Sequence, residues 1–210
     1  FYNDLLNKER KLIGEPQLSW LADTYGNSEV AWNILGQQVL MTKLKFPDIS
    51  SALSNSNLSE EVKQYLPLLK LGLPSNLDAW DGYPAERDRI FSLFKNNNSK
   101  LISLAGDTHN AWFSKLFNNA EEHIGYEFGT PSVTSPGLSE YLNGINPGEL
   151  EQGIINANKE IKWVNTSHRG YTKIYLNESI LKGTFKFIES VLEKSAEISF
   201  SKTFTIDLKS

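Results

Sequence analysis

Residues 101–109 read Leu-Ile-Ser-Leu-Ala-Gly-Asp-Thr-His. The apolar run 101–105 lies between polar residues, and a run of this length predicts a short buried strand. Gly106 allows tight backbone geometry where that strand ends. If the chain stays extended, Asp107 and His109 point to the same face, because side chains alternate along a strand. We therefore expect both side chains at the carboxyl edge of a sheet in an α/β protein, where ligands gather.

Asp107 and His109 allow two interpretations. A carboxylate oxygen and an imidazole nitrogen that converge on one point suit a divalent or trivalent transition metal. The alternative is a surface turn that contains an aspartate, followed by a histidine that caps a helix. The Asp-x-His spacing is common, so the spacing alone does not decide between them.

The composition is that of an ordinary globular protein. The chain has 210 residues, of which 40% are hydrophobic and 22% are charged, and this is enough to bury a core in one large domain. The net charge of −4 and the pI near 5.5 give no basic footprint for specific binding of nucleic acid. The chain has no cysteine, so it can form neither a disulfide nor a thiolate metal site. It shows no signal peptide and no apolar run long enough to cross a membrane.

Hydrophobic periodicity predicts alternating helices and strands, followed by antiparallel strands. Helices are expected over 17–25, from Ser59, over 84–94, over 110–117 and from Pro147. Strands are expected at the start of 30–41 as a central strand, over 101–105, over 124–128 and, near the end, over 171–176, 181–188 and 198–208. This order favours a layered α/β sandwich.

Five segments in one order carry a resemblance to a known family. They are the motifs at 32–39 (WNILGQQV), 78–87 (DAWDGYPAER), 105–112 (AGDTHNAW), 127–137 (EFGTPSVTSPG) and 168–171 (HRGY). Together they resemble the carboxyl-terminal half of the PhoD-like alkaline phosphatases, within the calcineurin-like metallophosphoesterase superfamily. The match runs from about residue 10 to 180. It therefore favours Asp107 and His109 as active-site residues.

The resemblance implies a fold and an activity. The implied fold is a four-layer α/β/β/α sandwich, of which residues 1–210 form the carboxyl-terminal part of a single domain. The implied activity is metal-dependent hydrolysis of phosphate monoesters or diesters, with Ca²⁺ and Fe³⁺ as the metal ions. Family members are typically exported, so the same location is implied for the parent protein.

The resemblance also suggests roles for individual residues. Asp107 and His109 would be metal ligands and the catalytic pair, and Asp81 would either bind a metal or hold Arg87. The residues that would contact the phosphate ester are Arg169, Asn110 and Gln37. Arg169 could instead form an ion pair, and Asn110 could cap a following helix. Gln37 could contact a metal ligand rather than the metal itself.

The other metal motifs of the superfamily should lie upstream of Trp32, and the chain shows none there. The cysteine that ligates iron in the family is also absent. We therefore expect this chain to supply part of an active site, to need the missing amino-terminal half, and to be inactive alone. The alternative is a non-catalytic binding or assembly module that retains half of the fold. An exposed sheet face near 34–39 and 101–104 would favour self-association.

Overall fold

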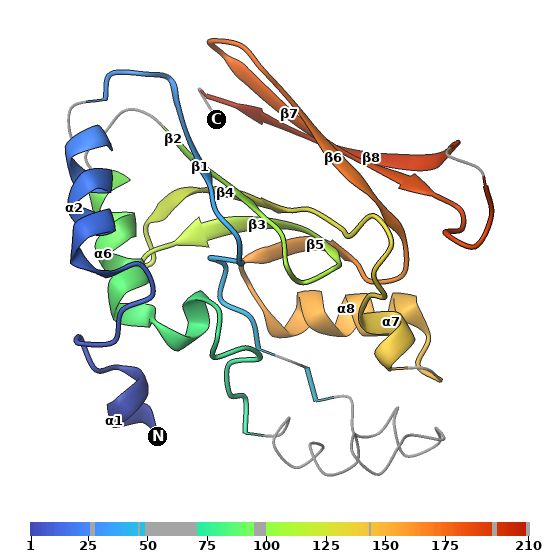
Figure 1. Ribbon diagram of the computed structural model, residues 1–210, viewed down its shortest axis with the longest axis horizontal. Helices are drawn as coiled ribbons and strands as arrows, with labels where there is room; N and C mark the ends of the chain where they lie inside the picture. Colours follow the sequence, from blue (N-terminus) through green and yellow to red (C-terminus); the bar gives the residue numbers. More distant parts are fainter. Residues whose placement is uncertain are drawn as a thin grey trace.

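The computed structural model describes residues 1–25, 28–45, 47–48, 71–94, 100–142, 144–194 and 197–208 (Figure 1). The helix expected from Ser59 lies outside these residues. The helices are α1 (Tyr2–Leu5), α2 (Gly14–Tyr25), α6 (Pro84–Phe94), α7 (Leu138–Tyr141) and α8 (Pro147–Ala157), with a 3₁₀ turn η1 at Trp80–Gly82. Within the described part of the chain, none of them has the length and apolar character needed to span a bilayer.

A five-stranded mixed sheet forms the centre of the fold. Its strands are β1 (Trp32–Gly36), β2 (Lys100–Ala105), β3 (Ala111–Phe117), β4 (His123–Gly129) and β5 (Ile161–Asn165), and their order is β1-β2-β4-β3-β5. β1, β2 and β4 are parallel, so their carboxyl ends meet at one edge of the sheet. The segment that follows β2 therefore lies at the edge where α/β proteins place their sites.

A three-stranded antiparallel sheet packs on one face of the first. Its strands are β6 (Arg169–Leu176), β7 (Ile180–Ile188) and β8 (Ile198–Asp207), in that order. Figure 1 shows this sheet across one face of the central sheet and the helices on the other side. The described residues thus form three layers, one of helices and two of strands. Within them, no helix covers the outer face of the second sheet, so the fourth layer of the expected sandwich is not seen.

Both faces of the central sheet are buried. Leu101 packs towards α2 and α6, while Ile102 packs between the two sheets, and both are 0% exposed. The expectation of an exposed sheet face is therefore wrong for 101–104, because helices and the second sheet cover it, whereas Ile34 on the edge strand β1 is 37% exposed. Self-association stays a prediction.

The helix expected over 110–117 is wrong, because Ala111–Phe117 forms β3. Trp112 and Phe113 both lie in cores, on opposite faces of the sheet, so the segment lacks the polar face of a surface helix. β5 was not predicted, and β1 lies at an edge of the sheet rather than in its centre. The helices over 17–25, 84–94 and from Pro147, the strands over 101–105 and 124–128, and the antiparallel strands at the end are confirmed.

The two sheets approach each other closely at Gly183 of β7. An added Cβ there would lie 2.0 Å from Cε1 of Phe128, in the core between the sheets. We expect Gly183→Ala to lower the free energy of unfolding by about 2 kcal/mol, because the ring must move in a packed interior.

Gly153 in α8 is the matched control for Gly183. Its added Cβ would meet only Pro47, at 3.5 Å, so Gly153→Ala should raise stability by about 0.5–1 kcal/mol. Urea denaturation measures both changes. A Gly183→Ala chain as stable as Gly153→Ala would contradict the packing described for Phe128.

Candidate active site at the carboxyl end of β2

The turn after β2 has an unusual backbone. Asp107 has φ 67° and His109 has φ 60°, so both lie in the left-handed region that few non-glycine residues adopt. The extended geometry expected for this segment is therefore wrong, since the strand ends at Ala105. Strained backbone of this kind persists only where the surrounding structure fixes it, and it is concentrated at functional sites.

Contacts with neighbouring segments hold this turn. The amide of Gly106 donates to the carbonyl of Gln38 at 3.0 Å, and the amide of Thr130 donates to the carbonyl of Ala105 at 2.7 Å. The indole of Trp112 donates to Oγ1 of Thr108 at 2.6 Å. The turn is thus fixed from both sides, and Asp107 itself is left exposed to solvent.

The ring of His109 is oriented by a backbone carbonyl. Its Nδ1 lies 3.0 Å from the carbonyl oxygen of Pro136. A carbonyl oxygen only accepts, so Nδ1 carries the hydrogen and Nε2 keeps a free lone pair. This is the arrangement in which a histidine binds a metal ion or accepts a proton through Nε2.

A cavity of about 490 Å³ borders the start of this turn, within the roughly 300–1,000 Å³ that is usual for small-ligand sites. It sits at the carboxyl ends of β1, β2 and β4, and Gly36, Gln38, Gly106 and Thr130 contribute to its walls. Asp107 and His109 follow Gly106 in the chain but do not line this cavity.

Gln37 lines the same cavity, yet its side chain is directed into the protein. Its Oε1 accepts from the indole of Trp80 at 3.0 Å and from the amide of Val39 at 3.2 Å, and its Nε2 donates to Oγ of Ser103 at 3.1 Å. All three contacts are internal. Substrate binding by Gln37 stays a prediction. The internal contacts favour the alternative, in which Gln37 touches neither the metal nor the substrate directly.

Asp81 lies in a buried ion pair. Its Oδ1 accepts from Nη1 of Arg87 at 2.7 Å, and its Oδ2 accepts from the amide of Leu44 at 2.9 Å. Asp81 was expected either to bind a metal or to hold Arg87, and the structure shows the contact with Arg87. Metal binding by Asp81 stays a prediction that no contact favours.

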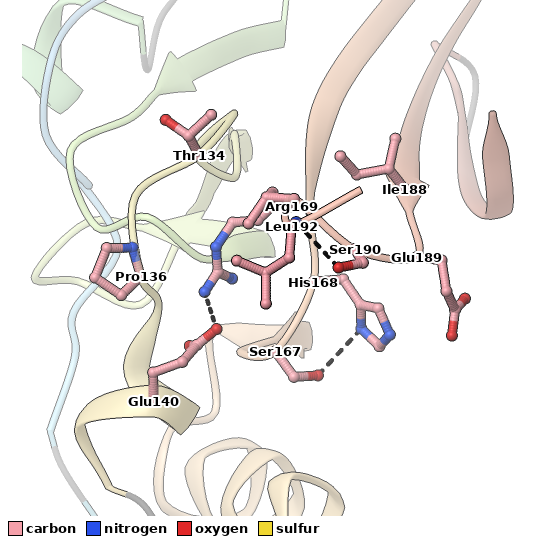
Figure 2. Close-up of a pocket in the computed structure, with 11 residues that line it drawn as sticks. Thr134, Pro136, Glu140, Ser167, His168, Arg169, Ile188, Glu189, Ser190 and Leu192 are labelled. Atoms are coloured by element: carbon pink, nitrogen blue, oxygen red, sulfur yellow. Dashed lines mark hydrogen bonds and ion pairs between the residues drawn. The ribbon is translucent and has the colours of Figure 1, made fainter. Parts of the chain in front are cut away.

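Arg169 and Asn110 also make internal contacts. Arg169 is 5% exposed and pairs with Glu140 at the edge of a cavity of about 360 Å³ (Figure 2). Oδ1 of Asn110 accepts from the amide of Leu138 at 2.9 Å, and no helix follows Asn110, so the expected cap is wrong. For both residues, contact with phosphate stays a prediction.

Sequence reasoning missed Glu127 in β4. This carboxylate is fully buried, and its oxygens accept from the amides of Met41 and Thr42 at 2.8 and 2.9 Å and from Oγ of Ser103 at 2.8 Å. Burial raises the pKa of Glu127 to about 7, although these hydrogen bonds and nearby Arg87 act in the opposite direction. The available signal was a single charged residue between buried aromatic positions of a strand.

The described residues do not form a complete metal site. Among them, no group of three or more histidine, cysteine, aspartate or glutamate residues is placed to hold a metal ion. Asp107 and His109 fit two positions in a set of oxygen and nitrogen ligands.

Comparison with known proteins identifies the family. A model of the PhoD-like phosphatases matches residues 1–185. Alkaline phosphatase D of Bacillus subtilis (strain 168) is 29% identical over 203 residues, which cover 94% of this chain and 30% of that protein. A solved structure of PhoD matches with a TM-score of 0.72 and 26% identity, over 99% of this chain and 36% of that chain. The chain therefore spans about a third of the length of these relatives, and it belongs to the PhoD-like phosphatase family.

Proposed function

We propose that this chain contributes Asp107 and His109 to a site that hydrolyses phosphate monoesters or diesters with the help of metal ions. The observation that carries the proposal is the pairing of His109 Nδ1 with the Pro136 carbonyl. It leaves Nε2 of the neutral ring free for a ligand, in the same turn after β2 that carries the exposed carboxylate of Asp107. Family membership supports the reaction class.

The two side chains fit hard cations, and we propose Ca²⁺ and Fe³⁺, which the family resemblance implies. Such ions neutralise phosphate oxygens and lower the pKa of bound water when they are present. Asp107 would hold a metal through its carboxylate. His109 would either hold a metal through Nε2 or, once Nε2 is protonated, donate that proton to the leaving oxygen.

We propose that the remaining ligands come from a polypeptide segment outside this chain. The relatives are about three times as long as the chain, and two donors cannot enclose a metal ion. We also propose that the parent protein is exported, as the family resemblance implies.

An activity assay tests the proposal. We expect the 210-residue chain, supplied with calcium and iron, to hydrolyse neither p-nitrophenyl phosphate nor bis-p-nitrophenyl phosphate. The longer protein that includes the upstream segment should hydrolyse at least one of them. Strong turnover by the chain alone would mean that the ligands lie elsewhere. A longer protein that binds no metal and hydrolyses neither ester would favour the binding module instead.

A further inference from the structure

Residues 41–45 form an extended segment whose backbone is held by side chains. The segment pairs with no strand, yet each of its amides donates to a side chain from another part of the fold. The acceptors are Glu127 for Met41 and Thr42, Glu160 for Lys43, Asp81 for Leu44 and Asn158 for Lys45, at 2.8 to 2.9 Å. Buried amides need partners, and here three carboxylates and one amide oxygen provide them.

Glu127 differs from the other acceptors because it also reaches the candidate site. Through Ser103, its carboxylate connects to Nε2 of Gln37. The amide of Gln37 donates to the carbonyl of Leu104 at 3.0 Å, and the carbonyl of Gln38 accepts from the amide of Gly106. Glu127 thus fixes the backbone of residues 41–42 directly and, through Ser103, the side chain of Gln37, and the backbone of Gln37 and Gln38 is bonded to the residues that lead into Asp107.

Glu127 has no direct ion-pair partner among the described residues. Nη1 of the nearby Arg87 on α6 donates to the carbonyl of Met41 at 3.1 Å and to Oδ1 of Asp81 at 2.7 Å rather than to Glu127. Burying a carboxylate without a direct ion pair is costly, so a purely structural position would more easily hold an apolar or amide side chain.

We propose that Glu127 is a positioning residue for phosphate ester hydrolysis, which holds residues 37–42 against the end of β2 and thereby fixes the turn of Asp107 and His109. This inference rests on the proposed function, because it needs the phosphatase reaction. The hydrogen bonds from which it is argued do not depend on that function. It assigns to a buried carboxylate of β4 the task of orienting the turn that carries Asp107 and His109.

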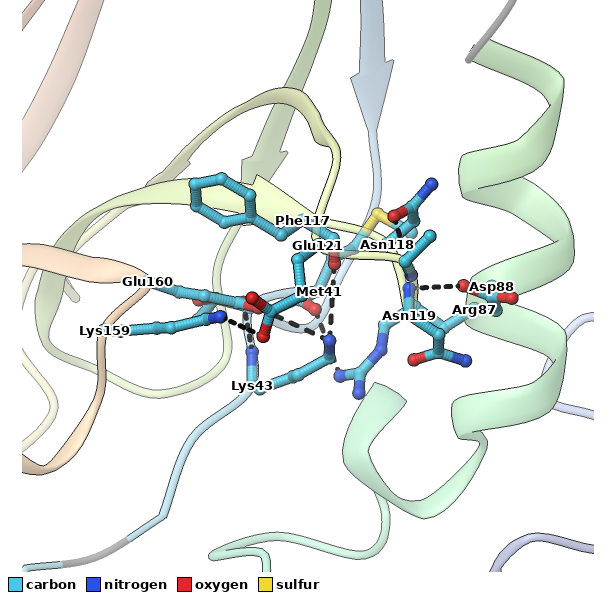
Figure 3. Close-up of polar contacts among 12 residues, drawn as sticks. Met41, Lys43, Arg87, Asp88, Phe117, Asn118, Asn119, Glu121, Lys159 and Glu160 are labelled. Carbon is cyan, nitrogen blue, oxygen red and sulfur yellow. Dashed lines mark hydrogen bonds and ion pairs between the residues drawn. The ribbon is translucent and has the colours of Figure 1, made fainter.

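Glu160 provides the matched control. It is 3% exposed, and its Oε2 accepts from the amide of Lys43 at 2.9 Å and from Oγ1 of Thr42 at 3.2 Å. Figure 3 shows it beside Lys43, whose Nζ lies 3.5 Å from Oε1 of Glu160. Glu160 thus holds the same segment, but among the described residues its carboxylate forms no hydrogen bond to Ser103, the residue that joins Glu127 to Gln37.

The experiment compares Glu127→Gln with Glu160→Gln in the longer active protein, at a pH above the pKa of Glu127. An amide offers one acceptor oxygen, so Glu127→Gln leaves one amide of Met41 or Thr42 unpaired. We expect kcat on p-nitrophenyl phosphate or its bis ester to fall about ten- to a hundredfold, with KM within about twofold. Glu160→Gln should leave kcat unchanged even where it lowers the melting temperature.

Hydrogen exchange supplies a readout independent of activity. In Glu127→Gln, peptides that contain Thr42 and Gly106 should both exchange faster, whereas in Glu160→Gln only the peptide around Lys43 should do so. If Glu127→Gln does not fold, Ser103→Ala can replace it, because it removes the hydroxyl that links Glu127 to Gln37. It should give the same pattern of faster exchange and lower kcat, with smaller changes.

The outcomes separate the two proposals. Equal loss of kcat in both variants, or unchanged exchange at Gly106 in Glu127→Gln, would overturn the role of Glu127 and leave the phosphatase proposal intact. A wild-type protein that hydrolyses neither ester would overturn the phosphatase proposal, while the exchange data would still decide whether Glu127 fixes the turn.

Discussion

Replacing Asp107 with asparagine in the longer protein is expected to lower kcat/KM for phosphate esters about a thousandfold. The substitution removes the negative charge that a metal ion needs and keeps the shape of the side chain. Asparagine is also one of the few residues that tolerate the left-handed backbone found at this position, where φ is 67°. The loss should therefore come from chemistry rather than from misfolding.

Glu121 is the matched control for Asp107. It is an exposed acidic residue with φ 61°, in the turn between β3 and β4. Because β4 runs parallel to β2, this turn lies at the opposite edge of the sheet from Asp107. Glu121→Gln should keep full activity and metal content, both measured on the same preparations. Asp107→Asn with more than about a tenth of wild-type activity would contradict a role for Asp107 in the reaction.

The sequence predicted the strand before Asp107 because that signal is local. The apolar run 101–105 is as long as a strand, and polar residues bound it on both sides. The motif order from Trp32 to Tyr171 then identified the family, which a single Asp-x-His pair could not do. What the sequence predicted well was therefore this strand and the family.

The local sequence pattern did not predict the structure where contacts between distant segments determine it. Ala111–Phe117 was expected to be helical, but strands on both sides pair with it, so its apolar residues are buried on both faces. Likewise, no periodicity shows that the amides of residues 41–45 find carboxylates up to 117 positions away. The role of Glu127 follows only from the folded contacts.

Glu127 should also give the stability of the chain a specific pH dependence. Its pKa is about 7 in the folded chain and 4.5 without the fold. Between these values the folded state holds a proton that the unfolded state has released, so raising the pH favours unfolding. The contribution of Glu127 is full below about pH 4.5 and falls by about 3 kcal/mol as the pH rises to about 7. Above that pH both states are ionised and the decline stops.

The measurement compares the wild type with Glu127→Gln, because other groups titrate in the same range. Burial lowers the pKa of His123, so its folded state binds fewer protons and its contribution rises with pH, opposite in sign to that of Glu127. Subtracting the two unfolding free energies at each pH from 4.5 to 8 cancels His123. The advantage of the wild type should shrink by about 3 kcal/mol across that range. A constant difference would mean that Glu127 stays ionised in the folded chain, so that its three hydrogen bonds outweigh the cost of burial.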